Sequence, residues 1–290
     1  MNELHILNVG RADCCVLLLD TQQGRKTVVV DGGELSCQGR APLLEFLQDR
    51  GIKTVDLLIL THLHQDHFGG FHQLIGRVTV GTLVAPCGDL VFHERVYPLF
   101  AQREFYREYH RIFAYFQRTG TVLRTSVSCA GGDFRFGEST LRCLYPKADS
   151  VLTSVACAQE LCRKDLTEEE LPPLLEAHKR ACNADSSIWL LEYEGRAVAL
   201  LPGDSTDACL RQALAGMDPV HPAVQKLSHH GIGQLYFSRT VQKALRPKFL
   251  VVSVDKAHYN ETMQKTVEAL AAAGGSRIHY TFRGEFTYRF

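Results

Sequence analysis

Three imidazoles and one carboxylate lie within six consecutive positions, at His62, His64, Asp66 and His67. These ligand types suit zinc, manganese or ferrous iron, and no cysteine lies among them, which argues against a purely structural zinc site. The cluster directly follows the apolar residues 57–60, which predict a buried strand. Because a strand directs alternate side chains to opposite faces, His62 and His64 share one face and can bind one ion. Asp66 and His67 open the next helix and face a second ion, so the spacing predicts a catalytic metal centre.

Further acids and imidazoles follow other predicted strands, at Asp31, Asp204, His229, His230 and His258. Asp31 precedes two glycines, which let the backbone turn sharply beside a buried carboxylate. Asp204 offers two oxygens and can therefore bridge two cations. Adjacent side chains point apart, so one of His229 and His230 is expected to bind metal while its neighbour addresses a ligand or the substrate. Each residue alone is compatible with a plain turn or loop, and only their joint occurrence indicates a site.

The elements that must position these residues are short apolar runs alternating with amphipathic stretches, a pattern typical of sheets that carry helices on their outer faces. Strands are predicted at 4–9, 14–19, 27–31, 55–60, 79–85, 187–192, 197–201, 224–227, 249–254, 277–281 and 286–288. Helices are predicted at 42–48, 66–75, 205–215, 240–245 and 262–272. The fold class is therefore α/β, with layered sheets and helices.

Residues from about 90 to 182 interrupt this alternation of short apolar runs and amphipathic stretches. They predict a long helix over 94–119, short strands over 134–145 and a charged helix over 164–180. We interpret residues 1–290 as a single domain with this segment as an insertion. An arginine recurs every four residues in the first helix, at Arg103, Arg107 and Arg111. The stripe is either a solvated face with intrahelical glutamate partners or a surface that contacts phosphates.

The composition is that of an ordinary globular protein, with 45% hydrophobic and 22% charged residues in 290. Lysine plus arginine equals aspartate plus glutamate at 32 each, so no global basic field indicates a nucleic-acid partner. The start of the chain lacks the pattern of a signal peptide, and no apolar run reaches the roughly 18 residues of a membrane span. Ten cysteines without a C-x-x-C pair favour a reduced, cytoplasmic chain.

The motif His62-x-His64-x-Asp66-His67 resembles the signature of the metallo-β-lactamase superfamily. That resemblance implies a four-layer αββα sandwich with metals at one edge. Further segments are similar to the hydrolase domain of ComEC-type DNA-uptake proteins and their free-standing relatives. They are Asn8 to Asp13, Asp31-Gly32-Gly33, Leu201 to Asp204, Lys226 to Gly231, Ser253-Val254 and Thr281 to Gly284.

The resemblance also implies a set of metal ligands. His62 and His64 would hold the first ion, and Asp66 with His67 the second. Asp204 would bridge the two ions, and His229 would complete the second site. The superfamily often supplies a third histidine to the first ion, and the expected stretch contains none. The segment 182–187 is instead similar to an N-x-x-S pattern of the relatives, which makes Asn183 or Asp185 the candidate extra ligand.

Together these residues predict a metal-dependent hydrolase of phosphodiesters, in which two divalent ions, Zn²⁺ or Mn²⁺, activate a hydroxide. An imidazole that titrates near working pH can protonate the leaving oxygen, a role open to His230 or His258. The candidate catalytic residues are Asp31, Asp66, His230 and His258. The candidate substrate-binding residues are Asn8, Asp13 and Lys226.

The substrate is left open by the sequence. The ComEC resemblance and the arginine stripe favour DNA or RNA, whereas the neutral net charge suits a small phosphodiester such as phosphorylcholine or a cyclic nucleotide. No membrane partner is expected. A rival hypothesis from another class is a binding scaffold that keeps the sandwich without catalysis, motivated by the missing third histidine.

Overall fold

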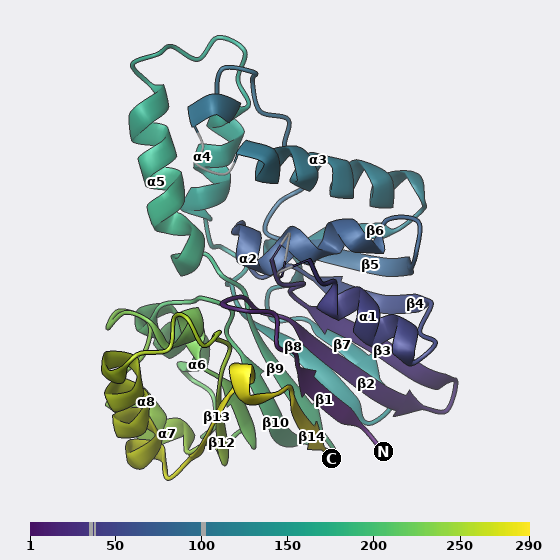
Figure 1. Ribbon diagram of the computed structural model, residues 1–290, viewed down its shortest axis with the longest axis vertical. Helices are drawn as coiled ribbons and strands as arrows, with labels where there is room; N and C mark the ends of the chain where they lie inside the picture. Colours follow the sequence, from purple (N-terminus) through teal and green to yellow (C-terminus); the bar gives the residue numbers. More distant parts are fainter. Residues whose placement is uncertain (35–36, 38, 100–102) are drawn as a thin grey trace.

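The chain folds into two seven-stranded sheets that pack face to face, with helices on both outer faces (Figure 1). The computed structural model describes residues 1–34, 37, 39–99 and 103–290. The predicted αββα sandwich is thereby confirmed. Its layers follow from the alternation of apolar side chains in each strand, because every strand must bury one face against the other sheet and one face against helices.

The first sheet runs β14 (Phe286–Arg289), β1 (Glu3–Ile6), β2 (Cys15–Thr21), β3 (Gly24–Val30), β4 (Thr54–Ile59), β5 (Thr79–Ala85), β6 (Val122–Thr125). The second runs β13 (Arg277–Tyr280), β12 (Phe249–Val252), β11 (Val224–Lys226), β10 (Arg196–Leu201), β9 (Ile188–Tyr193), β8 (Ser139–Tyr145), β7 (Asp133–Phe136). In strand β2, Leu17 and Leu19 lie in the core between the sheets, while Val16 and Leu18 lie in the core beneath the helices. Each fully buried leucine contributes roughly 1.5–3 kcal/mol to folding.

Helices cover each outer face of the sandwich. Over the first sheet lie α1 (Pro42–Asp49), α2 (Gln65–Phe68) with the 3-10 helix η1 (Gly69–Leu74), and α3 (Arg103–Arg118). Over the second lie α6 (Asp207–Leu214), α7 (Arg239–Leu245) and α8 (Glu261–Gly274). The remaining 3-10 helices are η2 (Tyr97–Leu99), η3 (Val127–Cys129), η4 (Ser228–Gly231) and η5 (Thr281–Arg283). None of the helices formed by the described residues is long and apolar enough to cross a membrane.

The segment 90–182 combines strands of the sandwich with a helical layer. Strand β6 extends the first sheet, and β7 and β8 extend the second. Helices α4 (Thr153–Leu161) and α5 (Leu171–Ala184) stand together beside α3 at the end of the molecule drawn at the top of Figure 1. The division of the chain into one domain and an insertion stays a prediction.

Two helix boundaries in this segment differ from the predicted ones. The helix expected from residue 94 begins at Arg103, after η2, and residues 100–102 lie outside the described part. Pro98 explains the late start, because proline lacks an amide hydrogen and is disfavoured inside a helix. The helix expected from residue 164 begins at Leu171, with prolines in its first turn, where a missing amide hydrogen costs nothing.

The two sheets bring the carboxyl ends of their parallel strands to one edge. Strands β3, β4 and β5 run parallel in the first sheet, and β10, β11 and β12 run parallel in the second. Loops that follow parallel strands meet at the same edge of a sheet, which is where such folds bind ligands. Asp31, the residues from His62 to His67, Asp204 and His230 follow these strands, and the fold therefore gathers them.

Candidate metal centre

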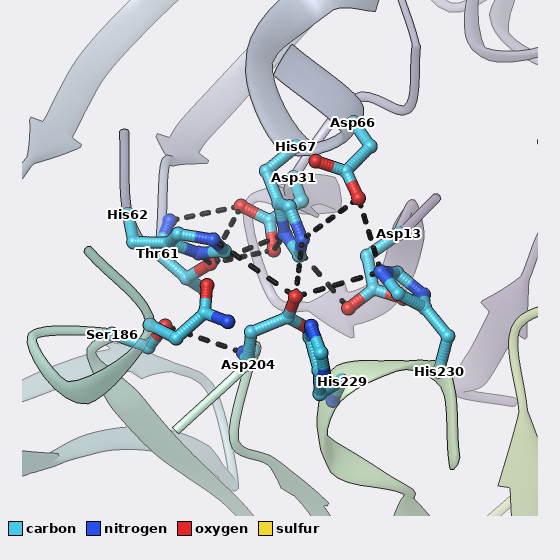
Figure 2. A network of polar contacts seen from close by, with 12 residues as sticks. Asp13, Asp31, Thr61, His62, Asp66, His67, Ser186, Asp204, His229 and His230 are labelled. Atoms are coloured by element: carbon cyan, nitrogen blue, oxygen red, sulfur yellow. Dashed lines mark hydrogen bonds and ion pairs between the residues drawn. The ribbon is translucent and has the colours of Figure 1, made fainter. Parts of the chain in front are cut away.

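Oxygen Oδ2 of Asp204 is the point on which the imidazoles converge (Figure 2). It lies 3.3 Å from Nε2 of His67, 3.5 Å from Nε2 of His230 and 4.0 Å from Nε2 of His62. Asp66 closes the group, since its Oδ2 lies 3.1 Å from Nε2 of His230. One ligand atom from each of Asp66, His67, Asp204 and His230 falls within 4.8 Å of the others. This spacing is that of donors arranged around a common cation.

Both sheets contribute to the cluster through the loops that follow their strands. Strand β4 ends at Ile59, and His62 lies three residues further along the chain. His67 lies in α2. Asp204 follows β10, and His230 lies in η4 after β11. His229 and His230 both have left-handed backbone conformations, with φ of 48° and 54°. Such conformations are strained for residues other than glycine and are found where a site requires them.

Asp31 fixes the orientation of His67. Its Oδ2 lies 2.8 Å from Nδ1 of His67, and its Oδ1 accepts a 2.8 Å hydrogen bond from the amide of Thr61. The Thr61 hydroxyl donates to the same carboxylate at 2.8 Å. When the His67 ring is neutral and carries its proton on Nδ1, the lone pair of Nε2 is available to a cation beside Asp204. A carboxylate behind a histidine is the common support of metal-binding imidazoles.

The residues present fit a bound cation. Nε2 of His62 and Nε2 of His67 are buried and have no hydrogen-bond partner among the described residues. A buried polar atom without a partner costs about 1–3 kcal/mol, so native proteins rarely leave two side by side. Both nitrogens face Asp204 Oδ2 within 4.0 Å. A divalent metal between them would satisfy all three atoms, and histidine and carboxylate donors suit zinc or manganese.

Burial and charge tune the protonation of the two candidate imidazoles of the first ion. Burial lowers the pKa of His64 to about 4 and that of His62 well below its usual value. Their rings are in edge contact, with centroids 4.7 Å apart. Both rings are therefore neutral near pH 7, the state that can bind a metal ion.

The other residues of the cluster carry opposite charges in the absence of metal. Burial alone would raise the pKa of Asp204, but the neighbouring His230, His67 and Lys226 hold it well below its usual value. Burial alone would lower the pKa of His67, but Asp204, Asp31 and Asp66 raise it well above its usual value. In the metal-free protein, protons on the imidazoles therefore supply the positive charge that metal ions would bring. Metal binding at this centre should release these protons.

Three predicted site residues lie apart from the convergence point. The ring of His229 packs on Tyr236 with centroids 3.9 Å apart, and its Nδ1 lies 2.7 Å from the carbonyl oxygen of Ile232. Its backbone amide, by contrast, donates to Oδ1 of Asp204. His258 is half-exposed and pairs with Asp255 at 2.8 Å. Asn8 lines a separate hollow beside α1.

The candidate extra ligands have different surroundings. Asn183 is buried and donates from Nδ2 to the Tyr236 hydroxyl at 2.9 Å, while its Oδ1 has no partner among the described residues. Asp185 accepts a 2.6 Å hydrogen bond from the amide of Ser154 at the start of α4. The pKa of Asp185 is raised by burial. Asp185 is therefore engaged in the helical layer, whereas the amide oxygen of Asn183 is free to accept.

Two residues of the site were not predicted from the sequence. Thr61 joins Asp31 to the motif, and the hydroxyl of Ser186 accepts a 3.3 Å hydrogen bond from the amide of Asp204. A hydroxyl residue between a buried strand and a metal motif is the signal that would have indicated Thr61, because its side chain can reach neighbouring carboxylates.

The arginine stripe of α3 is largely paired. Arg107 lies 3.7 Å from Glu94 and stacks over the ring of Tyr97. Arg111 pairs with Glu108 at 3.3 Å. The side chain of Arg103 lies outside the described residues. The pairs favour the solvated-face interpretation over a surface that contacts phosphates.

A buried histidine and aspartate cluster at the edge of two facing sheets defines the class of metallo-hydrolases with an αββα sandwich. The sequence profile described as "Metallo-beta-lactamase superfamily" matches residues 11–136. The chain is thus similar to this superfamily over the part that contains the motif from His62 to His67.

Two curated proteins are similar to this chain, one over nearly its whole length and one over a short segment. ComE operon protein 3 of Bacillus subtilis (strain 168) is 25% identical over 303 residues, which cover 99% of this chain and 33% of that protein. The chain thus spans about a third of the length of that relative. Hydroxyacylglutathione hydrolase of Serratia proteamaculans (strain 568) is 45% identical over 65 residues, 22% of this chain and 23% of that protein.

A solved structure shares the fold. Igni18, a metallo hydrolase of the archaeon Ignicoccus hospitalis KIN4/I, superposes with a TM-score of 0.51 at 15% sequence identity, covering 99% of both chains. At this identity the likeness shows the fold alone.

Proposed function

We propose that this protein is a metal-dependent hydrolase of phosphodiesters. The observation that carries the proposal is the convergence of two unpartnered, buried imidazole nitrogens on Oδ2 of Asp204. Such a constellation is costly to maintain without a cation, and a hollow lined by Arg11, Glu34, Gln65 and Asp66 lies beside it at the carboxyl edge of the strands. The match to the metallo-beta-lactamase superfamily profile supports hydrolysis as the reaction type.

The formal charge of the cluster supports two divalent ions. Four carboxylates lie in it, at Asp13, Asp31, Asp66 and Asp204, and one ammonium, at Lys226. With neutral imidazoles, the formal charge of these groups is −3. One divalent ion would leave the site negative, while two, Zn²⁺ or Mn²⁺, would leave it positive and able to attract an anion. This balance favours a phosphodiester over a neutral substrate.

The residues divide into two candidate ligand groups. His62 and His64 would hold one ion, Asp66, His67 and His230 the other, and Asp204 would lie between them through Oδ2. When bound, the ions would supply Lewis acidity and lower the pKa of a water molecule. The Asp31 carboxylate keeps Nε2 of His67 directed inward, and the backbone carbonyl oxygen of Ser253 does the same for His230 by accepting from its Nδ1 at 3.1 Å.

Two substrate classes remain within the proposal. Alignment with ComE operon protein 3 over 99% of this chain supports DNA or RNA. The net charge of zero and the paired arginines of α3 support a small phosphodiester instead. Nucleic-acid affinity falls steeply with salt because phosphate neutralisation releases counterions. Binding of labelled DNA at 50 and 200 mM salt therefore separates the classes.

The reaction type is tested by hydrolysis of bis-(p-nitrophenyl) phosphate, with p-nitrophenyl phosphate as the monoester comparison. Wild-type protein should carry about two equivalents of metal and cleave the diester. His67→Ala should lose metal and at least about 100-fold in activity. The matched control is His72→Ala, since Nδ1 of His72 bonds to the carbonyl oxygen of Gly69 in the adjoining 3-10 helix and His72 is not part of the cluster. Protein without bound metal or activity would instead support the binding scaffold.

We also infer a reducing compartment, the cytoplasm. All ten cysteines lie in the described part of the chain and are free thiols. Proteins of oxidising compartments generally pair theirs. Thiol counting by mass spectrometry after alkylation of cell lysate tests the inference, and paired cysteines would contradict it.

A further inference from the structure

Lys226, the last residue of β11, is buried beneath the metal centre with 1% of its surface exposed. Its ammonium lies 3.1 Å from the carbonyl oxygen of Gly203 and 3.4 Å from Oδ1 of Asp204. It also forms an ion pair with Oδ2 of Asp13. An ammonium has three donors, and here three oxygens surround it. The group therefore has no donor left for a substrate.

Asp13 extends this contact to the other side of the centre. Its Oδ1 lies 3.5 Å from Nδ1 of His230, and its backbone amide donates to the carbonyl of Asp66 at 3.0 Å. Asp13 belongs to the loop after β1 in the first sheet, whereas Lys226 and Asp204 belong to the second. The ion pair thus joins the two halves of the sandwich at the edge where the cluster forms.

The two oxygens of Asp204 consequently have separate surroundings. Oδ1 is held by the ammonium of Lys226 and by the backbone amide of His229 at 3.1 Å. Oδ2 is left to face the imidazoles of the cluster. A carboxylate held in this way presents one defined oxygen to a cation, because rotation about its side-chain bonds would break both contacts.

We propose that Lys226 is a positioning residue, the internal counter-ion that holds Asp204 and Asp13 in place before a metal ion binds. The proposal rests on the proposed function in so far as Asp204 is taken as a metal ligand. Its physical basis is charge: without the ammonium, the four carboxylates would depend on protonated imidazoles or on bound metal for positive charge. Burying a charged lysine is costly unless it is paired in this manner.

The test is Lys226→Met, which keeps the length of the side chain and removes the charge. Removing one partner of a buried ion pair should lower the melting temperature of the metal-free protein by roughly 10 °C. Adding Zn²⁺ should then raise the melting temperature more than it does in wild type, because the metal supplies the missing positive charge. Lys26→Met is the matched control, since Lys26 pairs with Asp56 at 3.0 Å at the opposite end of β3. It should change neither quantity by more than about 2 °C.

A second variant keeps the proposal falsifiable if Lys226→Met does not fold. Combining Lys226→Met with Asp13→Asn removes one negative charge together with the positive one. The double variant should melt at a higher temperature than Lys226→Met alone, because the charges are again balanced. A double variant that is no more stable than the single one, or that does not fold, overturns the proposal.

Kinetics separate this role from a substrate contact. A positioning residue should lower kcat on bis-(p-nitrophenyl) phosphate and leave KM within about threefold of wild type. Wild-type stability and metal response in Lys226→Met, with KM raised tenfold or more, would identify a substrate contact and overturn the proposal. If wild type binds no metal, the proposed function fails, while the stability difference between single and double variants still tests the counter-ion.

Discussion

Oδ2 of Asp31 lies 2.8 Å from Nδ1 of His67, and Nε2 of the same ring lies 3.3 Å from Oδ2 of Asp204. One imidazole thus connects a carboxylate of the first sheet with a carboxylate of the second. Asp31 itself is held by the amide and the hydroxyl of Thr61. The ring of His67 is therefore fixed from behind, which is the condition for a strong metal ligand.

Asp31→Asn should weaken metal binding without removing a ligand. Loss of the carboxylate charge behind His67 makes its ring less basic and less firmly oriented, which typically lowers metal affinity by about 10- to 100-fold. Competition with a chromophoric chelator measures this affinity. Asp56→Asn, which alters a surface pair with Lys26, is the control and should retain wild-type affinity. Equal affinities in wild type and Asp31→Asn would show that His67 does not depend on Asp31.

The neighbouring histidines His229 and His230 should behave differently when replaced. His230→Asn removes a nitrogen that lies 3.5 Å from Oδ2 of Asp204, and should lower the metal content to about one equivalent and activity by at least about 100-fold. His229→Asn should retain both metals, because the ring of His229 packs on Tyr236 and only its backbone amide contacts Asp204. Asparagine is chosen because it tolerates the left-handed backbone of both positions.

Metal analysis of both purified variants provides the check. Loss of metal from His229→Asn, with full occupancy in His230→Asn, would reverse the assignment and restore the ligand set implied by the resemblance. Thermal melting of each variant serves as the folding control.

The stability of the metal-free protein should depend on pH through His64. Burial lowers the pKa of His64 in the folded protein to about 4, against 6.5 for an unperturbed ring. Between these values the unfolded chain binds a proton that the folded chain does not, so stability falls as the pH is lowered from about 6.5 toward 4. The contribution of His64 is at most about 3 kcal/mol and is fully present above pH 6.5.

Urea denaturation at pH 7 and pH 5 in the presence of a chelator measures this dependence. His64→Gln should lose less stability between the two pH values than wild type, because glutamine cannot be protonated. An identical loss in both proteins would assign the pH dependence to other groups.

The sandwich was predictable from the sequence because the pattern of apolar residues in its strands is clear. Residues 79–85 form β5 as predicted, and the cluster from His62 to His67 lies at the end of β4 where the spacing placed it. The sequence did not decide which of His229 and His230 faces inward, because that choice depends on two consecutive left-handed residues. Periodicity and propensity carry no information on such conformations.

The role of Lys226 could not be predicted from the sequence for a related reason. A lysine near a strand end is usually solvated, and only the packing of the two sheets shows that this one is enclosed by Asp13 and Asp204. Asp13 and Lys226 are 213 positions apart in the chain, so no local pattern could pair them. Contacts between distant segments require the tertiary fold.

Gly70→Ala should destabilise both the fold and the metal centre. The new Cβ would lie 2.0 Å from the carbonyl oxygen of Gly32, a backbone atom in the turn that follows Asp31. That turn is also held by a 3.1 Å hydrogen bond from the amide of Gly70 to the carbonyl of Gly33. A backbone oxygen cannot rotate away on its own as the end of a side chain can. The whole turn must therefore shift, at a cost of roughly 2–4 kcal/mol in the free energy of unfolding.

The shift of this turn should also weaken metal binding, because Asp31 directly precedes the turn. Displacing this turn moves the carboxylate away from Nδ1 of His67, so zinc affinity should fall together with stability. Gly88→Ala is the matched control, since its Cβ would meet no atom within 4 Å. The control should change the free energy of unfolding by less than about 1 kcal/mol and leave zinc affinity unchanged. If Gly70→Ala matched the control in urea denaturation and in zinc titration, the turn could not be the rigid support of His67 that the structure describes.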